Sequence, residues 1–103
     1  MADVTPVTLS AKERVVLDLL ASAADTMYGL ELVAKSEGRL KRGTVYVTLG
    51  RMEQKGYIES EQEKRLDGAI GLPRRVYRPT ALGERALRAW AAFTQELAWG
   101  VQR

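Results

Sequence analysis

Basic side chains gather at two places in the sequence, and clustered Lys and Arg residues are typical of surfaces that bind phosphate. Residues 39–55 hold five Lys or Arg against a single Glu, and residues 74–78 read RRVYR with three more positive charges. One such run is most simply a solvated face. Two of them around the segment TVYVT (44–48) indicate an anionic partner, although the whole chain carries only +3.

Residue types that most enzymes need are absent. The 103 residues include no Cys and no His, which excludes disulfides, Cys/His zinc sites and Ser-His-Asp triads. Neither a GxGxxG motif nor a P-loop motif occurs. An enzyme would depend on carboxylates, Lys or Tyr alone, so we expect neither catalysis nor a metal or other cofactor.

The length of the chain suits one domain. A composition of 46 % hydrophobic and 28 % charged residues is typical of a globular protein. No run approaches the roughly 20 apolar residues of a membrane span. The first residues, MADVTPVT, lack the basic and apolar regions of a signal peptide, so we expect a cytoplasmic protein.

The basic clusters must be positioned by secondary structure, which the spacing of apolar residues predicts. We expect a flexible arm over residues 1–8. SAKE is a capping box and begins a helix at about 10–22. A second helix is predicted over 27–36, followed by the basic turn GRLKRG. The apolar face of this second helix is expected to comprise Leu30, Val33 and Ala34.

The segment TVYVT has the composition of a strand but stands at the start of a helical pattern. As a strand, its alternation ends within a few residues. As a helix, Val45, Leu49 and Met52 share one face, and Gly56 follows as a left-handed stop. We therefore predict a helix at about 42–55.

Two alternating segments come next. YIESEQEK (57–64) and RVYRPT (75–80) predict the strands of an exposed hairpin, joined by a flexible loop that contains Gly and Pro. Thr80 then caps a final helix at about 81–99. The apolar stripe of this helix is expected to run through Leu82, Ala86, Trp90, Phe93 and Leu97.

This order of elements is that of a winged helix-turn-helix, a mainly α fold with a small β-hairpin. The helices at 27–36 and 42–55 form the helix-turn-helix, and the hairpin forms the wing. We divide the chain into a flexible arm (1–8), a winged helix-turn-helix DNA-binding domain (9–80) and a C-terminal dimerisation helix (81–103).

A helix-turn-helix places its second helix in the DNA major groove. The face of this helix that points away from the core carries compact side chains, which allow a duplex to approach closely. Tyr46 can bind a phosphate or a thymine methyl group, or it can be a core or interdomain aromatic residue. The candidate DNA-binding residues here are Lys41, Arg42, Thr44, Tyr46, Val47, Thr48 and Arg51.

The hairpin supplies further candidate contacts to DNA. Lys64 and Arg65 are explained equally well by a solvated loop, whereas Arg74 and Arg75 adjoin the ordered strand. Three carboxylates at alternate positions of the other strand are interpreted as edge protection rather than as a metal site: Glu59, Glu61 and Glu63.

The last helix has more apolar surface than one small domain readily covers. Trp90, Phe93, Leu97 and Trp99 predict a homodimer, which would place two recognition helices about one DNA turn, roughly 34 Å, apart. Alternatively, Trp90 and Phe93 complete the core of the monomer. The two roles are compatible on different turns of the helix.

Three segments resemble the PadR-like family of bacterial transcriptional regulators. YGLEL (28–32), GTVYVTLGRMEQKGYI (43–58) and RRVYRPTALGERAL (74–87) follow the family pattern YGYEL, GTLYxxLxRLExxGLI and RKYYxLTxxG. The resemblance covers most of residues 9–88, and its middle motif is specific. The loop at 65–73 is longer and richer in Gly than the family pattern.

The resemblance implies a winged-helix DNA-binding domain, a homodimer formed by the C-terminal helix, and repression relieved by a small-molecule effector. The family's recognition-helix contacts fall on Thr44 and Tyr46, and its wing contacts near Arg74–Arg75. A single C-terminal helix is typical of the short members of the PadR-like family. In some short members, aromatic residues of this helix line a pore for flat ligands, a role that would fall to Trp90 or Trp99.

We therefore expect a transcriptional regulator that binds a palindromic site on double-stranded DNA as a homodimer, with a small-molecule effector as a further candidate partner. The alternative is a winged-helix module that binds protein and no longer reads DNA. Salt dependence separates them, because a protein that makes several phosphate contacts loses affinity steeply between about 50 and 200 mM salt.

Overall fold

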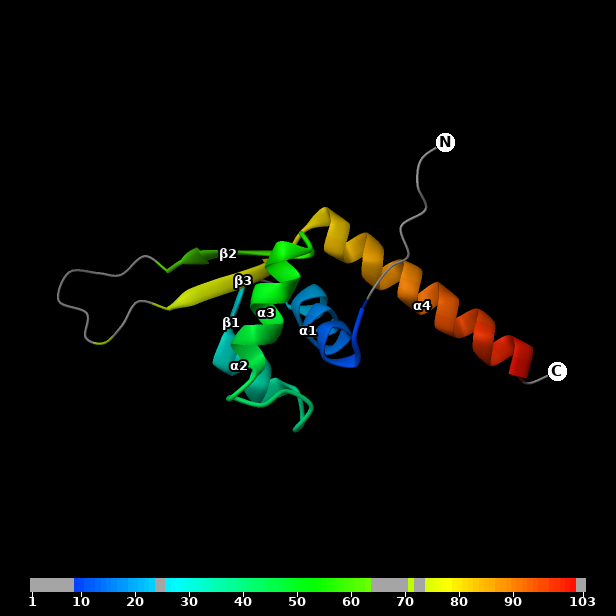
Figure 1. Ribbon diagram of the computed structural model, residues 1–103, viewed down its shortest axis with the longest axis horizontal. Helices are drawn as coiled ribbons and strands as arrows, with labels where there is room; N and C mark the ends of the chain where they lie inside the picture. The colour runs from blue at the N-terminus through cyan, green and yellow to red at the C-terminus, as the bar shows by residue number, and fades with distance from the viewer. Residues whose placement is uncertain (1–8, 24–25, 64–70, 72–73, 102–103) are drawn as a thin grey trace.

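The computed structural model describes residues 9–23, 26–63, 71 and 74–101, with the side chains of the last helix described as far as Thr94. It confirms the predicted fold, a mostly helical winged helix-turn-helix (Figure 1). The strands form an antiparallel sheet of order β1-β3-β2. The elements are α1 (Ala11–Ser22), β1 (Met27–Tyr28), α2 (Gly29–Lys35), α3 (Val45–Gln54), β2 (Ile58–Gln62), β3 (Arg75–Pro79) and α4 (Ala81–Val101).

Helix α1 begins at the predicted capping box. The N–H of Glu13 donates to Oγ of Ser10 at 3.1 Å, and the N–H of Ser10 donates to Oε1 of Glu13 at 2.8 Å. Both carboxylate oxygens of Glu13 also accept from Nζ of Lys55 at 2.9 Å. The start of α1 is thereby tied to the residue that follows α3.

Glu13 is buried, with 4 % of its side chain exposed. Burial on its own would raise the pKa of Glu13. The hydrogen bond from the Ser10 N–H and the ion pair with Lys55 outweigh burial, so that the pKa lies below its usual value of 4.5. Glu13 is therefore ionised at neutral pH, and its charge is neutralised locally.

The predicted helix at 27–36 is shorter than expected, since Met27–Tyr28 form strand β1 instead. This strand pairs with β3, Met27 opposite Tyr77. The predicted apolar face is also wrong at Leu30, which is 47 % exposed, and at Ala34, which is exposed as well. Leu32 is fully buried in its place, because the short helix turns Gly29 and Leu32 toward the core.

The segment TVYVT is helical from Val45 onward, which confirms the prediction of a helix over a strand. Residues 41–44 form a turn rather than the first helical turn, with the N–H of Val45 donating to the carbonyl of Lys41 at 2.9 Å. At the other end Gly56 has φ +79°. The N–H of Gly56 donates to the carbonyl of Glu53, and the N–H of Tyr57 donates to the carbonyl of Met52. This is the hydrogen-bond pattern of a Schellman motif, which ends the helix.

One core joins the four helices to the sheet. Helix α1 packs against α2, α3, α4 and β3. The most deeply buried side chains of this core come from both helices of the helix-turn-helix as well as from α1. Burial of apolar surface therefore holds the inner side of α3 against the domain. The largest fully buried side chains are Leu17, Leu32, Leu40, Leu49, Met52, Val16 and Val45.

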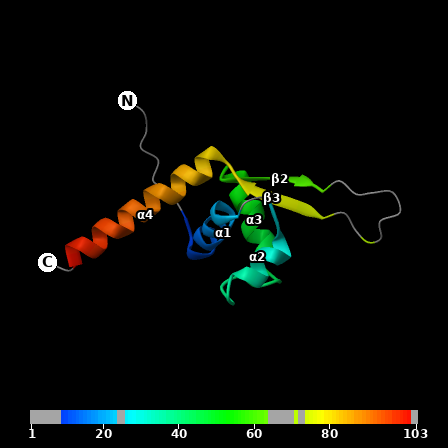
Figure 2. The ribbon, with the colours of Figure 1, turned by 180° about the vertical axis from the view of Figure 1, so that it is seen from behind.

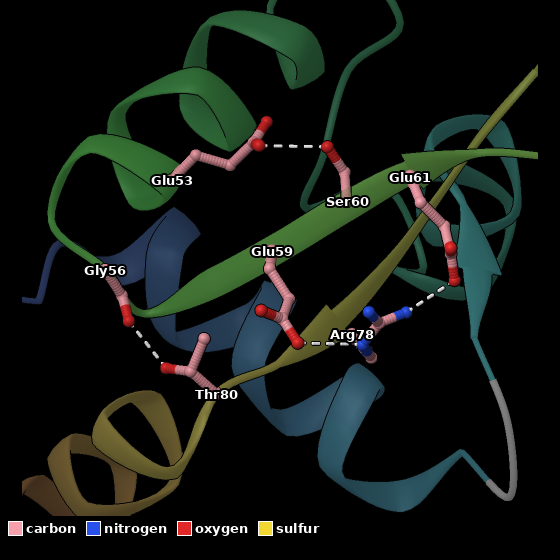
Figure 3. A network of polar contacts seen from close by, with 7 residues as sticks. All are labelled: Glu53, Gly56, Glu59, Ser60, Glu61, Arg78 and Thr80. Carbon is pink, nitrogen blue, oxygen red and sulfur yellow. Dashed lines mark hydrogen bonds and ion pairs between the residues drawn. The ribbon is translucent and has the colours of Figure 1, made fainter.

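The wing and α4 extend from this core in different directions (Figures 1 and 2). They meet at Thr80, which caps α4 as predicted by accepting the N–H of Gly83 at 3.0 Å. Oγ1 of Thr80 also donates to the carbonyl of Gly56 at 2.5 Å, and its N–H donates to the carbonyl of Tyr57 at 3.0 Å (Figure 3). The start of α4 is thus bonded to the residues that end α3.

The first turns of α4 complete the core. Ala86 is buried, and Trp90 packs against the buried cluster. Leu82, expected on the apolar stripe, is 43 % exposed, and Phe93 is 52 % exposed. The predicted arm at 1–8 and the side chains of Leu97 and Trp99 lie outside the described residues. None of the described helices has the length and hydropathy needed to cross a membrane.

Candidate nucleic-acid interface

Helix α3 has a buried back and an exposed front. Val45, Leu49 and Met52 are at most 1 % exposed and attach it to the core. On the front, Tyr46 is 53 % exposed and Val47 is 58 % exposed, although both are large hydrophobic residues. These two side chains form a ridge along the exposed side of α3, and we call it the α3 ridge.

The other candidates on this segment divide into two groups. Lys41, Arg42, Thr44 and Arg51 are exposed beside the α3 ridge. Thr48, also predicted on the DNA-facing side, is only 9 % exposed. Its Oγ1 approaches the carbonyl of Thr44 at 3.4 Å, so the hydroxyl is turned back along the helix. The helical period explains this, because Thr48 stands three residues after the buried Val45 and four before the buried Met52.

A cleft of about 560 Å³ lies on one side of the α3 ridge, between α2, α3 and the base of the wing. Tyr46 contributes its ring from α3, and Leu30 lies on the α2 side. The exposure of Leu30 is accounted for here, since it lines this cleft rather than the core. The other lining residues are Tyr28, Gly29, Glu31, Ala34, Arg74, Arg75 and Tyr77.

Arg74 is held at the outer edge of the cleft by two contacts. Its guanidinium lies 4.2 Å from the centre of the Tyr28 ring, and Nη2 is 3.6 Å from Oε1 of Glu63. The Tyr28 hydroxyl donates to the same carboxylate, a hydrogen bond that raises the pKa of Tyr28 above its usual value of 10.0. Despite these contacts, 64 % of the Arg74 side chain is exposed to solvent.

Arg75, which lines the same cleft, is held by a different set of contacts. Its Nε donates to Oγ of Ser60 at 3.1 Å, and Ser60 donates to Glu53 of α3 at 2.9 Å (Figure 3). This chain of contacts connects the wing base to the last turn of α3. The two adjacent arginines, both predicted as wing contacts, are therefore positioned separately, one by Tyr28 and one through Ser60.

Two carboxylates of β2 bind an arginine of the neighbouring strand β3. Arg78 donates to Glu59 at 2.9 Å and to Glu61 at 2.7 Å across the β2–β3 pair (Figure 3). These two carboxylates raise the pKa of Arg78 above its usual value. Within the described ranges, no three carboxylates gather as a metal site. The predicted wing residues Lys64 and Arg65, with most of the 65–73 loop, lie outside the described residues.

Sequence reasoning overlooked Tyr28 and Gly29 as parts of the interface. Both lie at the join of β1 and α2, and both line the cleft beside Tyr46. The available signal was the dipeptide Tyr-Gly ahead of a short helix, where an aromatic residue and a residue without a side chain stand together.

Comparison with known proteins gives consistent matches. The family model described as "Transcriptional regulator PadR-like family" matches residues 16–89. The chain is 30 % identical to a PadR family transcriptional regulator from Eggerthella lenta, with a TM-score of 0.67, covering 84 % of this chain and 77 % of that one. Against a PadR family regulator from Clostridium difficile the identity is 24 % and the TM-score 0.73, covering 90 % and 96 %.

A more distant match is the structure of Bacillus subtilis PadR in complex with operator DNA. It has 18 % identity and a TM-score of 0.67, covering 82 % of this chain and 48 % of that one, so the likeness is one of fold. Among curated proteins no sequence matches the chain.

Proposed function

The chain belongs to the PadR-like family of transcriptional regulators, and on that premise we propose that it represses transcription by binding a palindromic operator as a homodimer. In this proposal α3 enters the major groove and the wing base contacts the adjacent backbone. A small-molecule effector that binds between the protomers releases the DNA. The protein would act in the cytoplasm, on double-stranded DNA.

The observation that carries the proposal is the α3 ridge. Tyr46 and Val47 are adjacent and both more than half exposed, on a helix whose other side is packed into the core. Apolar and aromatic side chains at that position can contact thymine methyl groups and phosphates in a major groove. The exposed Lys41, Arg42 and Arg51 add positive charge beside it.

The Bacillus subtilis PadR structure supports DNA binding by a protein of this fold. That protein has the same fold and is described in complex with operator DNA. We therefore expect α3, with the base of the β2–β3 wing, to face the duplex.

The dimer is supported by α4. This helix leads away from the core, and Phe93 is 52 % exposed with its ring centroid 6.0 Å from that of Trp90. A second copy packing on this face would remove apolar surface from water at about 25 cal/mol per Å². The same ring pair offers a stacking surface to a flat effector.

The direct test is selection of bound duplexes from random DNA, followed by titration of the recovered sequence with the purified chain. We expect an inverted repeat to be recovered, with affinity that falls steeply from about 50 to 200 mM salt. Tyr46→Ala should weaken binding to the selected duplex, while Lys35→Gln on α2 should not. The proposal fails if the wild-type chain binds no duplex at low salt, the result expected of a protein-binding module.

A further inference from the structure

The α3 ridge has a second cleft on its other side. This cleft has a volume of about 490 Å³ and lies between the first turn of α1 and the exposed side of α3. Val47 lines it, whereas its neighbour Tyr46 lines the cleft beside the wing. Two consecutive residues of α3 therefore face different clefts, and the α3 ridge separates them.

Two cations line this second cleft from its two walls. Lys12 comes from α1 and Arg51 from α3, and both are exposed. In the part of the chain that the structure describes, neither side chain forms an ion pair. Both charges are therefore available to an anionic partner.

The remaining charge in this cleft belongs to Glu13, and it is already neutralised. Its carboxylate is 4 % exposed and lies 2.9 Å from Nζ of Lys55. The capping box also occupies the main-chain N–H groups of Ser10 and Glu13. Binding of an anion in this cleft therefore rests on the side chains of Lys12 and Arg51, and not on the end of the helix.

The arrangement has a counterpart in the cleft beside the wing, where Arg74 and Arg75 supply two cations. A helix in the major groove, which is about 12 Å wide, has a sugar-phosphate backbone on each side. In the proposed function the wing base contacts one of these backbones. The cleft between α1 and α3 is on the other side of the α3 ridge, the side on which the second backbone is expected.

We propose that Lys12 and Arg51 bind the phosphodiester backbone on the α1 side of α3, across the major groove from the backbone contacted by the wing base. This inference rests on the proposed function and extends it to α1, whose residues had no part in the DNA-binding prediction. Each cation would neutralise one phosphate and add affinity with little dependence on sequence.

The test uses the full chain and three charge-removing variants: Lys12→Gln, Arg51→Gln and, as a matched control, Lys35→Gln. Lys35 is exposed on α2 and lines a different cleft, beside Asp18 and Leu19. Binding is measured against salt concentration on the duplex recovered by selection and on a mixed-sequence duplex of equal length.

We expect Lys12→Gln and Arg51→Gln each to reduce the slope of log K against log salt by about one unit. The effect should be equal on both duplexes, and Lys12→Arg should restore the wild-type slope. Lys35→Gln should leave the slope unchanged. If Lys12→Gln matches the Lys35→Gln control, the proposal is overturned while DNA binding itself stands.

A second measurement locates the contact. Phosphates at which ethylation interferes with wild-type binding are mapped, and the mapping is repeated with Lys12→Gln and Arg75→Gln. The positions lost in Lys12→Gln should lie across the major groove from those lost in Arg75→Gln. Loss on the same side of the groove contradicts the proposal, and failure of the wild type to bind any duplex overturns the proposed function as a whole.

Discussion

The ring of Tyr46 fills the space in front of Gly29. A methyl group at Gly29 would lie 2.7 Å from Cε1 of Tyr46 and 2.9 Å from its hydroxyl oxygen. Because carbon atoms do not approach so closely, the absence of a side chain on the first residue of α2 lets the ring of Tyr46 lie against the domain. The two halves of the helix-turn-helix are matched at this contact.

Gly29→Ala is therefore expected to displace Tyr46 rather than to unfold the protein, because the ring is the far end of a flexible side chain. Affinity for the selected duplex should fall roughly tenfold, equivalent to about 1.4 kcal/mol, with the thermal midpoint nearly unchanged. Titration of the duplex by fluorescence anisotropy measures this. In a Tyr46→Ala background the same substitution should have little further effect, and additive losses would show that Tyr46 is not the link.

Gly50 on α3 gives a prediction that separates stability from DNA binding. A Cβ atom at Gly50 would have nothing within 4 Å apart from the nearby backbone of α3 itself. Gly50→Ala should therefore raise the free energy of unfolding by about 0.5–1 kcal/mol, since Gly is unfavourable inside a helix. Gly50→Leu should stabilise the fold to a similar degree, because Leu is also a good helix former.

The two variants at position 50 should differ in binding, because a large side chain there would hold the duplex away from the helix. Urea unfolding and duplex titration on both variants give the comparison. Equal affinity for Gly50→Leu and Gly50→Ala would mean that this part of α3 does not approach the DNA closely.

The pair formed by Glu13 and Lys55 predicts a dependence of stability on pH. The pKa of Glu13 is lowered in the folded protein relative to 4.5. Its contribution is therefore present above the unfolded pKa and is lost as the pH falls through the folded value. In Glu13→Gln the free energy of unfolding at neutral pH should be lower than in the wild type by about 1–2 kcal/mol. The part of the loss of stability in acid that comes from protonating Glu13 should then be absent. Denaturant midpoints from pH 7 to pH 3, compared with Glu59→Gln, test the assignment.

Phe93 is the residue on which we test the proposed dimer. Phe93→Asp should weaken self-association by about 2 kcal/mol, or roughly thirtyfold, if the exposed ring lies in the interface. Arg88→Ala is the control, because it lies two residues from Trp90 and thus on the opposite side of α4. Sedimentation equilibrium over a range of micromolar concentrations measures both. A wild-type chain that sediments as a monomer would remove the basis for the prediction.

Elements in which apolar residues repeat regularly over several turns can be predicted from the sequence. The sequence predicts helix α3 because Val45, Leu49 and Met52 repeat at helical spacing and Gly56 ends the pattern, although residues 42–44 form a turn before it. It does not predict strand β1, because two residues carry no period and its pairing partner Tyr77 lies far along the chain. Local pattern alone does not contain such a pairing.

The same distinction holds for the interface. The exposed positions Tyr46 and Val47 and the buried position Thr48 all follow from the helical period of α3. The sequence alone does not predict a role for Lys12, because its cleft forms only when α1 is folded beside α3. Residues that act together from separate elements require the tertiary structure.

The contacts of Thr80 set the direction of α4. Two hydrogen bonds, to the carbonyls of Gly56 and Tyr57, connect the first residues of this helix to the residues that end α3. Helix α4 has 21 residues and is therefore about 30 Å long. If α4 tilts as a rigid rod about Thr80, a tilt of about 5° moves its far end by roughly 3 Å. In a dimer built on α4, the angle between α4 and the rest of the domain would therefore decide whether both recognition helices meet successive turns of one duplex.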